Sequence, residues 1–222
     1  MVACCLLVVL SGCAGLGVGP DGAPADGTPV DGTATPAGST EIAPPPNGTL
    51  EVHVIDVGQA DATLLRTDEE TMLIDSGDWR DDGETVLEYL DARGVDRIDH
   101  LVSTHGHADH VGGHEAIVDH YETEREGVGA VYDSGVTHTS RTYERYLDAV
   151  ERHDVTLFEV RSGDEIPLDG AAATVLSPSA PVGDDLHDNG VSVSVAVGET
   201  SFLFTGDAER EAESRLLEAH GD

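Results

Sequence analysis

The sequence predicts an α/β fold in which helices cover a sheet. Short runs of alternating or continuous apolar residues predict strands, and runs with apolar residues three or four positions apart predict helices. The two kinds of element are interleaved along the chain, which is typical of layered α/β domains. All of these runs lie in residues 50–222, which is enough chain for one hydrophobic core.

The expected elements follow from this periodicity and from the turn residues between them. Strands are expected at 50–57, 62–66, 71–75, 98–104, 130–132, 156–160, 173–176, 191–197 and 201–204. Helices are expected at 84–92, 114–121, 142–152 and 209–219. The helix at 84–92 shows the pattern well, because Val86, Leu87 and Leu90 form one apolar face and Gly94 follows its end.

Two other segments precede this domain. Residues 1–12 form an apolar run of signal-peptide length that ends in Leu10-Ser11-Gly12-Cys13, which resembles a lipobox. We expect residues 1–13 to be a lipoprotein signal peptide and lipobox with Cys13 as the lipidated residue, although no Arg or Lys precedes the run and a buried strand or helix is the alternative. Residues 14–49 are rich in Gly, Pro, Ala, Thr and Asp and predict a disordered linker. The chain is thus expected to be extracytoplasmic and anchored to the cell membrane by lipid.

The charge balance excludes one kind of binding surface. Among 222 residues, 44 are Asp or Glu and 11 are Arg, with no Lys, so the net charge is −33. Eleven positive side chains cannot build a basic nucleic-acid-binding surface against this background. Such a dense carboxylate surface is typical of proteins that work in concentrated salt, where charge repulsion is screened within about 3 Å at 1 M. We therefore expect a halophilic protein, with simple solubility as the alternative reading.

The most informative stretch is THGHADHVGG at 104–113, where His105, His107, Asp109 and His110 fall within six residues. The stretch directly follows an expected buried strand and precedes a helix, so its side chains converge at one strand end. Neutral imidazoles with carboxylates suit Zn, Mn or Fe. A solvated His-rich loop is the alternative. The cysteines, which are Cys4, Cys5 and Cys13, cannot serve as ligands in the globular part.

These residues resemble a known family. THGHADHVGG is similar to the H-x-H-x-D-H motif of the metallo-β-lactamase fold superfamily. DVGQADA at 56–62 and FTGDAE at 204–209 resemble signatures of the hydrolase domain of ComEC-type competence proteins, and LIDSG at 73–77 matches an early motif of the fold. The resemblance implies a metallo-β-lactamase-like αβ/βα sandwich over 50–222.

The resemblance also implies roles for individual residues. His105 and His107 would hold one divalent metal ion, Asp109 and His110 a second, and Asp207 would bridge the two. Asp109 and Asp207 would thereby serve catalysis. The two ions, Zn by preference with Mn or Fe as alternatives, would share a hydroxide nucleophile. Read on its own, Asp207 could instead cap the following helix.

Further residues are assigned supporting roles. Asp75 would fix a ligand histidine through its second ring nitrogen, with an ordinary turn Asp as the alternative. Asp56, Gln59 and Asp61 would shape the loop beside the site, although a plain turn explains them nearly as well. Asn189 matches an Asn of the family. The other scattered histidines are expected to be surface or core residues: His53, His100, His114, His120, His138 and His153.

Two departures from the family pattern concern the ligands and the end of the fold. The superfamily usually has a third His about 20 residues before the bridging Asp, where this chain has His187. In competence-type members that His is often absent, so His187 is the lesser candidate beside Asn189. The family pattern continues past the GDAE helix to a His-His-Gly-Ser strand. The second half of the sandwich is therefore expected to be incomplete, with a partner chain as one means of completing it.

The function expected from the sequence is a membrane-tethered, extracytoplasmic, metal-dependent hydrolase. A phosphodiesterase or nuclease fits the resemblance, and DNA is then a partner at high salt, because a charge of −33 opposes polyanion binding otherwise. The alternatives are hydrolysis of a lactam, lactone or thioester, or a truncated, non-catalytic module that binds metal or another protein.

Overall fold

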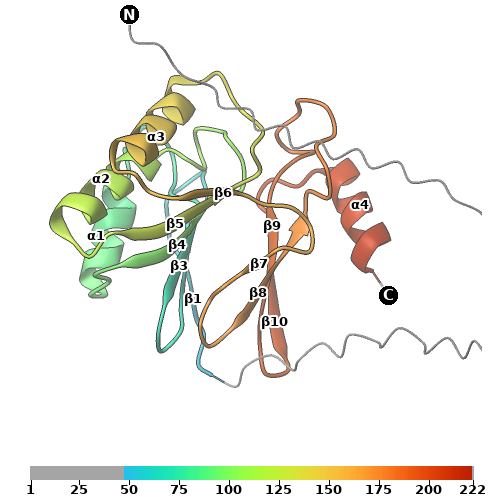
Figure 1. Ribbon diagram of the computed structural model, residues 1–222, viewed down its shortest axis with the longest axis horizontal. Coiled ribbons are helices and arrows are strands. Elements are labelled where there is room, and N and C mark those ends of the chain that lie inside the picture. Colours follow the sequence, from blue (N-terminus) through green and yellow to red (C-terminus); the bar gives the residue numbers. More distant parts are fainter. Residues whose placement is uncertain (1–47, 222) are drawn as a thin grey trace, which may run out of the picture. The chain divides into compact units, whose positions relative to one another are not determined.

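Two β-sheets pack face to face in residues 48–221, which are the residues that the computed structural model describes (Figure 1). The predicted signal peptide with Cys13 and nearly all of the predicted linker lie outside these residues. Three helices cover the outer face of the first sheet, and a fourth lies against the second sheet. Within 48–221, no helix is long and apolar enough to cross a membrane.

The first sheet contains six strands in the order in which they occur in the sequence. They are β1 (Glu51–Val54), β2 (Thr63–Arg66), β3 (Thr71–Ile74), β4 (Ile98–Val102), β5 (Val128–Asp133) and β6 (Leu157–Glu159). The first three strands are antiparallel, and β3 to β6 are parallel. Parallel neighbours need a crossover between them, so each of the last three connections carries a helix.

The crossover helices are α1 (Glu84–Ala92), α2 (His114–Glu124) and α3 (Arg141–Arg152). Strand residues alternate between the two faces of the sheet, so one set packs under these helices and the other faces the second sheet. In β2, Leu64 joins the cluster under the helices, whereas Leu65 joins the cluster between the sheets. Leu101 and Val102 of β4 divide in the same way. Both faces are therefore buried, which explains the continuous apolar runs.

The second sheet is antiparallel, in the order β10-β9-β8-β7. Its strands are β7 (Glu165–Ile166), β8 (Ala172–Ser177), β9 (Ser192–Val197) and β10 (Thr200–Phe204), and α4 (Arg210–His220) follows. Ala173, Val175, Val193 and Val195 pack against the first sheet. Ala212 is the buried residue of α4, so this helix is held mainly at its first turns.

The predicted α/β sandwich is confirmed, and most expected elements form close to their expected bounds. The strand expected at 50–57 ends at Val54, because pairing with β2 stops at the Val54–Thr63 pair and the chain turns into a loop. Helix α2 extends past the expected end at 121 to Glu124. Strand β7 was not predicted, since two residues are too few to show a period.

We expect Leu101→Ala to lower the free energy of unfolding by about 2–5 kcal/mol, because it opens a cavity under the helices. Leu101 is fully buried in this cluster. The matched control is Leu217→Ala on α4, where the side chain is 70% exposed, and the change should stay within about 0.5 kcal/mol. Denaturant titration measures both, and equal losses would contradict the assignment of the core.

Candidate metal centre

The candidate ligands gather where parallel strands end. Strands β3 and β4 run side by side with Ile74 paired to Val102, so Asp75 and the loop that begins at Ser103 leave the sheet at the same edge. The Ser76 N–H donates to the His110 carbonyl at 2.8 Å, and the Asp75 N–H donates to the Val102 carbonyl at 2.9 Å. Parallel pairing therefore brings together two motifs that lie about 30 residues apart in the sequence.

One group of potential ligands consists of His105, His107 and His187, each with a ring nitrogen within 4.8 Å of the others. His105 Nε2 and His107 Nδ1 lie 2.8 Å apart. His187 comes from the loop between β8 and β9, and its ring centroid is 4.7 Å from that of His107. The spacing to Asp207 indicated His187, although sequence reasoning ranked it lower. His187 therefore lies among the expected ligands.

A second group consists of His105, His110 and Asp207, whose ligand atoms also lie within 4.8 Å of one another. The distance from His110 Nε2 to Asp207 Oδ1 is 3.3 Å. Asp207 follows β10 of the second sheet, so the centre lies where both sheets end. Gly206 has a φ of +51°, and a Cβ there would lie 2.8 Å from Thr104 Cβ, so glycine lets the two loops approach this closely.

Asp75 orients His110. Its buried carboxylate accepts hydrogen bonds from His110 Nδ1 at 2.7 Å, from the Thr104 hydroxyl at 2.6 Å and from the Thr104 N–H at 2.8 Å. With Nδ1 bound to a carboxylate, His110 presents Nε2 toward Asp207 and His105. This is the contact predicted for Asp75, and it distinguishes the residue from an ordinary turn Asp.

The electrostatics keep His105 and His107 in the neutral form that binds metal. Burial, followed by the neighbouring His110 and His107, lowers the pKa of His105 to about 2. Burial and the nearby His187 lower the pKa of His107 as well. His110 differs: burial lowers its pKa, but the hydrogen bond and charge of Asp75 outweigh this and raise the pKa to about 9. Without a cation nearby, the Asp75–His110 pair therefore holds a proton.

Asp109 lies beside these groups and belongs to neither of them. It lines a cavity of about 190 Å³ together with Gln59, Asp61, His110 and Asp207. Its backbone is tied to the loop before β2, because the Asp61 N–H donates to the Asp109 carbonyl at 3.3 Å. Gln59 and Asp61 therefore line the same cavity as His110 and Asp207, and a cation held in this cavity would be within reach of Asp109.

Asp56 and Asn189 support loops. The Asp56 carboxylate accepts the Gly58 N–H at 3.3 Å within its own turn, which is the plain-turn alternative stated for it. Asn189 is buried, accepts the Val182 N–H at 2.6 Å and donates to the Asp185 carbonyl at 2.6 Å. Its side chain thus closes the loop that carries His187, so Asn189 and His187 have different tasks and do not compete for one role.

Two of the histidines expected to be surface or core residues lie close to the candidate ligands. His138 lies with its ring centroid 5.5 Å from that of His107, and its buried Nδ1 has no hydrogen-bond partner among residues 48–221. His114 is fully buried beneath the site, with Nδ1 2.5 Å from the Ser76 hydroxyl. Burial, followed by nearby His110, lowers the pKa of His114 to about 3. His138 is isolated in the sequence, so only the folded chain reveals its neighbours.

A third strand end carries a buried acid. Asp133 closes β5, and its carboxylate accepts the Gly135 N–H at 2.7 Å and the Tyr146 hydroxyl at 3.4 Å. Burial raises the pKa of Asp133 to about 6, and these hydrogen bonds only partly offset the effect. The carboxylate is therefore costly to ionise in the folded protein.

Comparisons with known proteins find a family model and two relatives that match the chain. The family model described as "Metallo-beta-lactamase superfamily" matches residues 55–222. The chain is 29% identical over 184 residues to ComE operon protein 3 of Bacillus subtilis, covering 75% of this chain and 23% of that protein. It is 28% identical over 179 residues to the competence protein ComA of Neisseria gonorrhoeae, covering 79% of this chain and 22% of that protein. The chain thus spans less than a quarter of the length of these relatives.

A solved structure agrees at the level of the fold. The metallo-beta-lactamase fold protein YhfI from Bacillus subtilis superposes with a TM-score of 0.52 at 12% identity, covering 71% of this chain and 62% of that one. At this identity the match supports the fold alone, and it agrees with the two-sheet architecture of Figure 1.

We expect Asp75→Asn to weaken zinc binding by about 10–100-fold, because an amide no longer fixes His110 as a hydrogen-bonded carboxylate does. The control is Asp148→Asn, an exposed position on α3, which should leave zinc affinity unchanged. Competition with a fluorescent chelator measures affinity, and circular dichroism checks that both variants fold. A folded Asp75→Asn protein with unchanged affinity would contradict the role assigned to Asp75.

We expect Asp133→Asn to gain stability relative to the unmodified chain as the pH rises. The raised pKa of about 6 means that the folded state keeps a proton that the unfolded state, with an ordinary value of 3.8, has lost. This preference stabilises the folded chain at low pH and disappears as the pH passes about 6. The variant should therefore gain on the order of 2–3 kcal/mol between pH 4.5 and 7.5, as measured by denaturant titration. A stability difference between the two chains that stays constant over this pH range would refute it.

Proposed function

The chain belongs to the metallo-beta-lactamase superfamily, and on that premise we propose that it is a metal-dependent hydrolase that cleaves phosphodiester bonds. One observation carries the proposal above all. Two groups of potential ligands, drawn from the loops after β4, β8 and β10, share His105 and meet at one edge of the sandwich. Such an arrangement offers places for two neighbouring cations.

The donor set fits divalent metal ions. His105, His107 and His187 would hold one ion, and Asp109, His110 and Asp207 the other. Imidazole nitrogens with carboxylate oxygens suit Zn, and Mn and Fe are the alternatives. When bound, two such ions activate water and neutralise charge that develops on the scissile group.

The chain's own residues prepare the site for this chemistry. His105 and His107 are neutral because of their burial, so no proton must leave them before a cation binds. Asp75 holds His110 in one orientation. The Asp207 side chain is 45% exposed and lines the small cavity with Gln59 and Asp61, so it can face both the ions and a substrate.

The substrate class rests on the relatives. The chain resembles the hydrolase domain of ComEC-type competence proteins, and that resemblance favours a nucleic-acid phosphodiester over a lactam, lactone or thioester. The charge of −33 opposes polyanion binding at low salt, so the activity is best sought near 1 M salt, where charges farther apart than about 3 Å are screened. A chain without turnover would be the non-catalytic module considered above.

We further propose that the protein is extracytoplasmic and is anchored to the cell membrane by lipid. The support for this is in the sequence, where the apolar run of residues 1–12 ends at the lipobox-like Cys13. A single acyl chain gives only marginal membrane affinity, so stable tethering by Cys13 needs more than one chain on that residue.

We expect the zinc-loaded chain to hydrolyse bis(p-nitrophenyl) phosphate in ~1 M salt, and His105→Ala to lower kcat/KM by more than about 100-fold. The reason is that His105 belongs to both ligand groups. His220→Ala is the matched control, since His220 bonds the Leu176 carbonyl far along α4. Release of p-nitrophenolate and elemental analysis give rate and metal content.

Three results would decide against the proposal. Absence of bound metal, or equal rates for His105→Ala and His220→Ala, would remove the hydrolase altogether. Hydrolysis of a lactam or thioester substrate without any phosphodiester turnover would keep the metal centre and replace the substrate class.

A further inference from the structure

Trp79 occupies an unusual position beside the metal centre. It is the only tryptophan of the chain, and its side chain is 49% exposed. Its backbone N–H donates to the Ala108 carbonyl at 2.9 Å, and the Gly112 N–H donates to the Gly77 carbonyl at 3.0 Å. A Cβ on Gly112 would lie 2.2 Å from Trp79 N, so the two loops are in direct contact. The backbone of Trp79 is thus fixed to the loop that carries His107 and His110.

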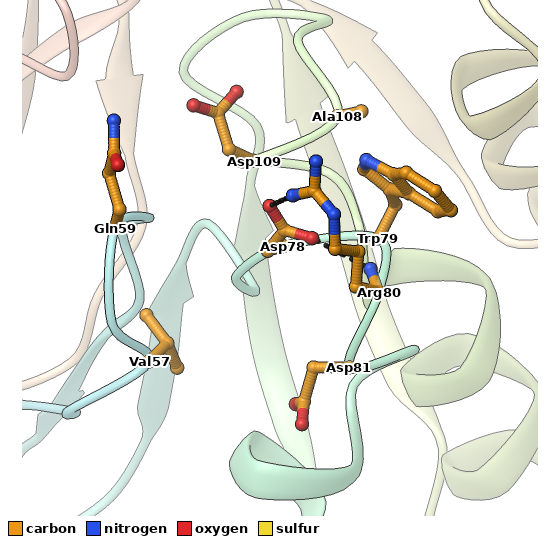
Figure 2. Close-up of a pocket in the computed structure, with 8 residues that line it drawn as sticks. All are labelled: Val57, Gln59, Asp78, Trp79, Arg80, Asp81, Ala108 and Asp109. Carbon is orange, nitrogen blue, oxygen red and sulfur yellow. Dashed lines mark hydrogen bonds and ion pairs between the residues drawn. The ribbon is translucent and has the colours of Figure 1, made fainter.

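Two hollows flank this indole. The first, of about 580 Å³, is lined by Val57, Gln59, Asp78, Trp79, Arg80, Asp81, Ala108 and Asp109 (Figure 2). The second, of about 480 Å³, is lined by Trp79, Asp82, Arg141, Thr142 and Arg145. The first hollow shares Gln59 and Asp109 with the small cavity that contains His110 and Asp207. The three cavities therefore share lining residues in sequence and form a path from the metal centre past Trp79 to Arg141.

Charge is distributed unequally along this path. Of the 11 arginines in the chain, three surround Trp79. The Arg80 guanidinium lies over the indole, 4.9 Å from the ring centroid, and is held by Asp78 at 2.7 Å. Arg145 pairs with Glu115 at 2.9 Å and with Asp82 at 3.1 Å. Arg141 is exposed and makes no ion pair with any residue in 48–221, so its charge is free for a ligand.

We propose that this path binds single-stranded nucleic acid, with one base stacked on Trp79 and a neighbouring phosphate at Arg141. The inference rests on the proposed function, because it places the scissile phosphodiester at the metal centre. The first hollow contains Asp78, Asp81 and Asp109, which repel a phosphate but tolerate an uncharged base. The phosphate next to that base therefore belongs on the Arg141 side.

Stacking on Trp79 requires a single strand rather than a duplex. A base can place its face on an aromatic side chain only when it is out of a duplex stack. Stacking on an aromatic side chain strengthens binding and tolerates any base, because every base has a flat face. The Arg80 guanidinium, which pairs with Asp78, lies over the ring. A duplex is therefore expected to bind more weakly than a strand.

The single tryptophan makes the test direct, because the intrinsic indole fluorescence of the full chain reports Trp79 alone. We expect an eight-residue oligothymidylate to quench this fluorescence saturably in metal-free protein, where no hydrolysis competes. An abasic strand with the same number of phosphates should not quench. Equal quenching by both strands, or none by either, would overturn the stacking role.

Variants test each contact by the anisotropy of a labelled oligothymidylate. Trp79→Ala should weaken binding by about tenfold or more, and Trp79→Phe by less, because an aromatic face remains. Phe158→Ala is the matched control, since Phe158 is also 49% exposed but lies on β6, away from the path. Loss of affinity below about twofold in Trp79→Ala would contradict the proposal.

Arg141→Gln should lower the slope of log affinity against log salt by about 0.7, which corresponds to one phosphate contact on a single strand. Arg93→Gln is its control, because Arg93 stacks on Tyr89 outside both hollows. An unchanged slope would remove Arg141 from the site. Quenching in a chain that does not hydrolyse bis(p-nitrophenyl) phosphate would refute only the proposed function, whereas hydrolysis with an inert Trp79 would refute only this inference.

Discussion

The candidate centre depends on the hydrogen bonds that the buried carboxylate of Asp75 accepts. It joins the end of β3 to the loop after β4 by accepting hydrogen bonds from Thr104 and His110 at once. A buried charge without partners would cost several kcal/mol, so the loop that supplies these donors must close over it. The same closure presents the free nitrogen of His110 to Asp207. One acid thus fixes both the shape of the ligand loop and the direction of a ligand.

The acidic surface leaves the interior of the fold unaffected. Two apolar clusters, one under the helices and one between the sheets, form the core. Several of the few arginines link helices, because Arg145 and Arg152 both pair with Glu115 and Arg125 pairs with Asp91. Such exposed pairs add little individually. Their value here is to offset repulsion where acidic helices lie side by side.

Structural features that depend on a local pattern of residue types could be predicted from the sequence. Buried strands such as β4 show apolar runs, and four candidate ligands within six residues mark the histidine loop. The spacing to Asp207 pointed to His187, but sequence reasoning ranked it below Asn189, because the separate tasks of the two residues depend on how the loop folds. The sequence did not indicate that His138 and Trp79 lie near the candidate ligands, because their neighbours come from distant loops. Strand β7 is too short for any period to appear.

The candidate ligands all lie outside helices and strands. His105, His107, Asp109 and His110 lie between β4 and α2, His187 lies between β8 and β9, and Asp207 lies between β10 and α4. The sandwich therefore acts as a frame, and the donors sit on three connections that can change without rebuilding it. Replacing a residue inside a strand alters how firmly the frame holds, whereas exchanging one connection alters which ions and substrates are accepted. Descendants of such a chain can acquire new chemistry one loop at a time.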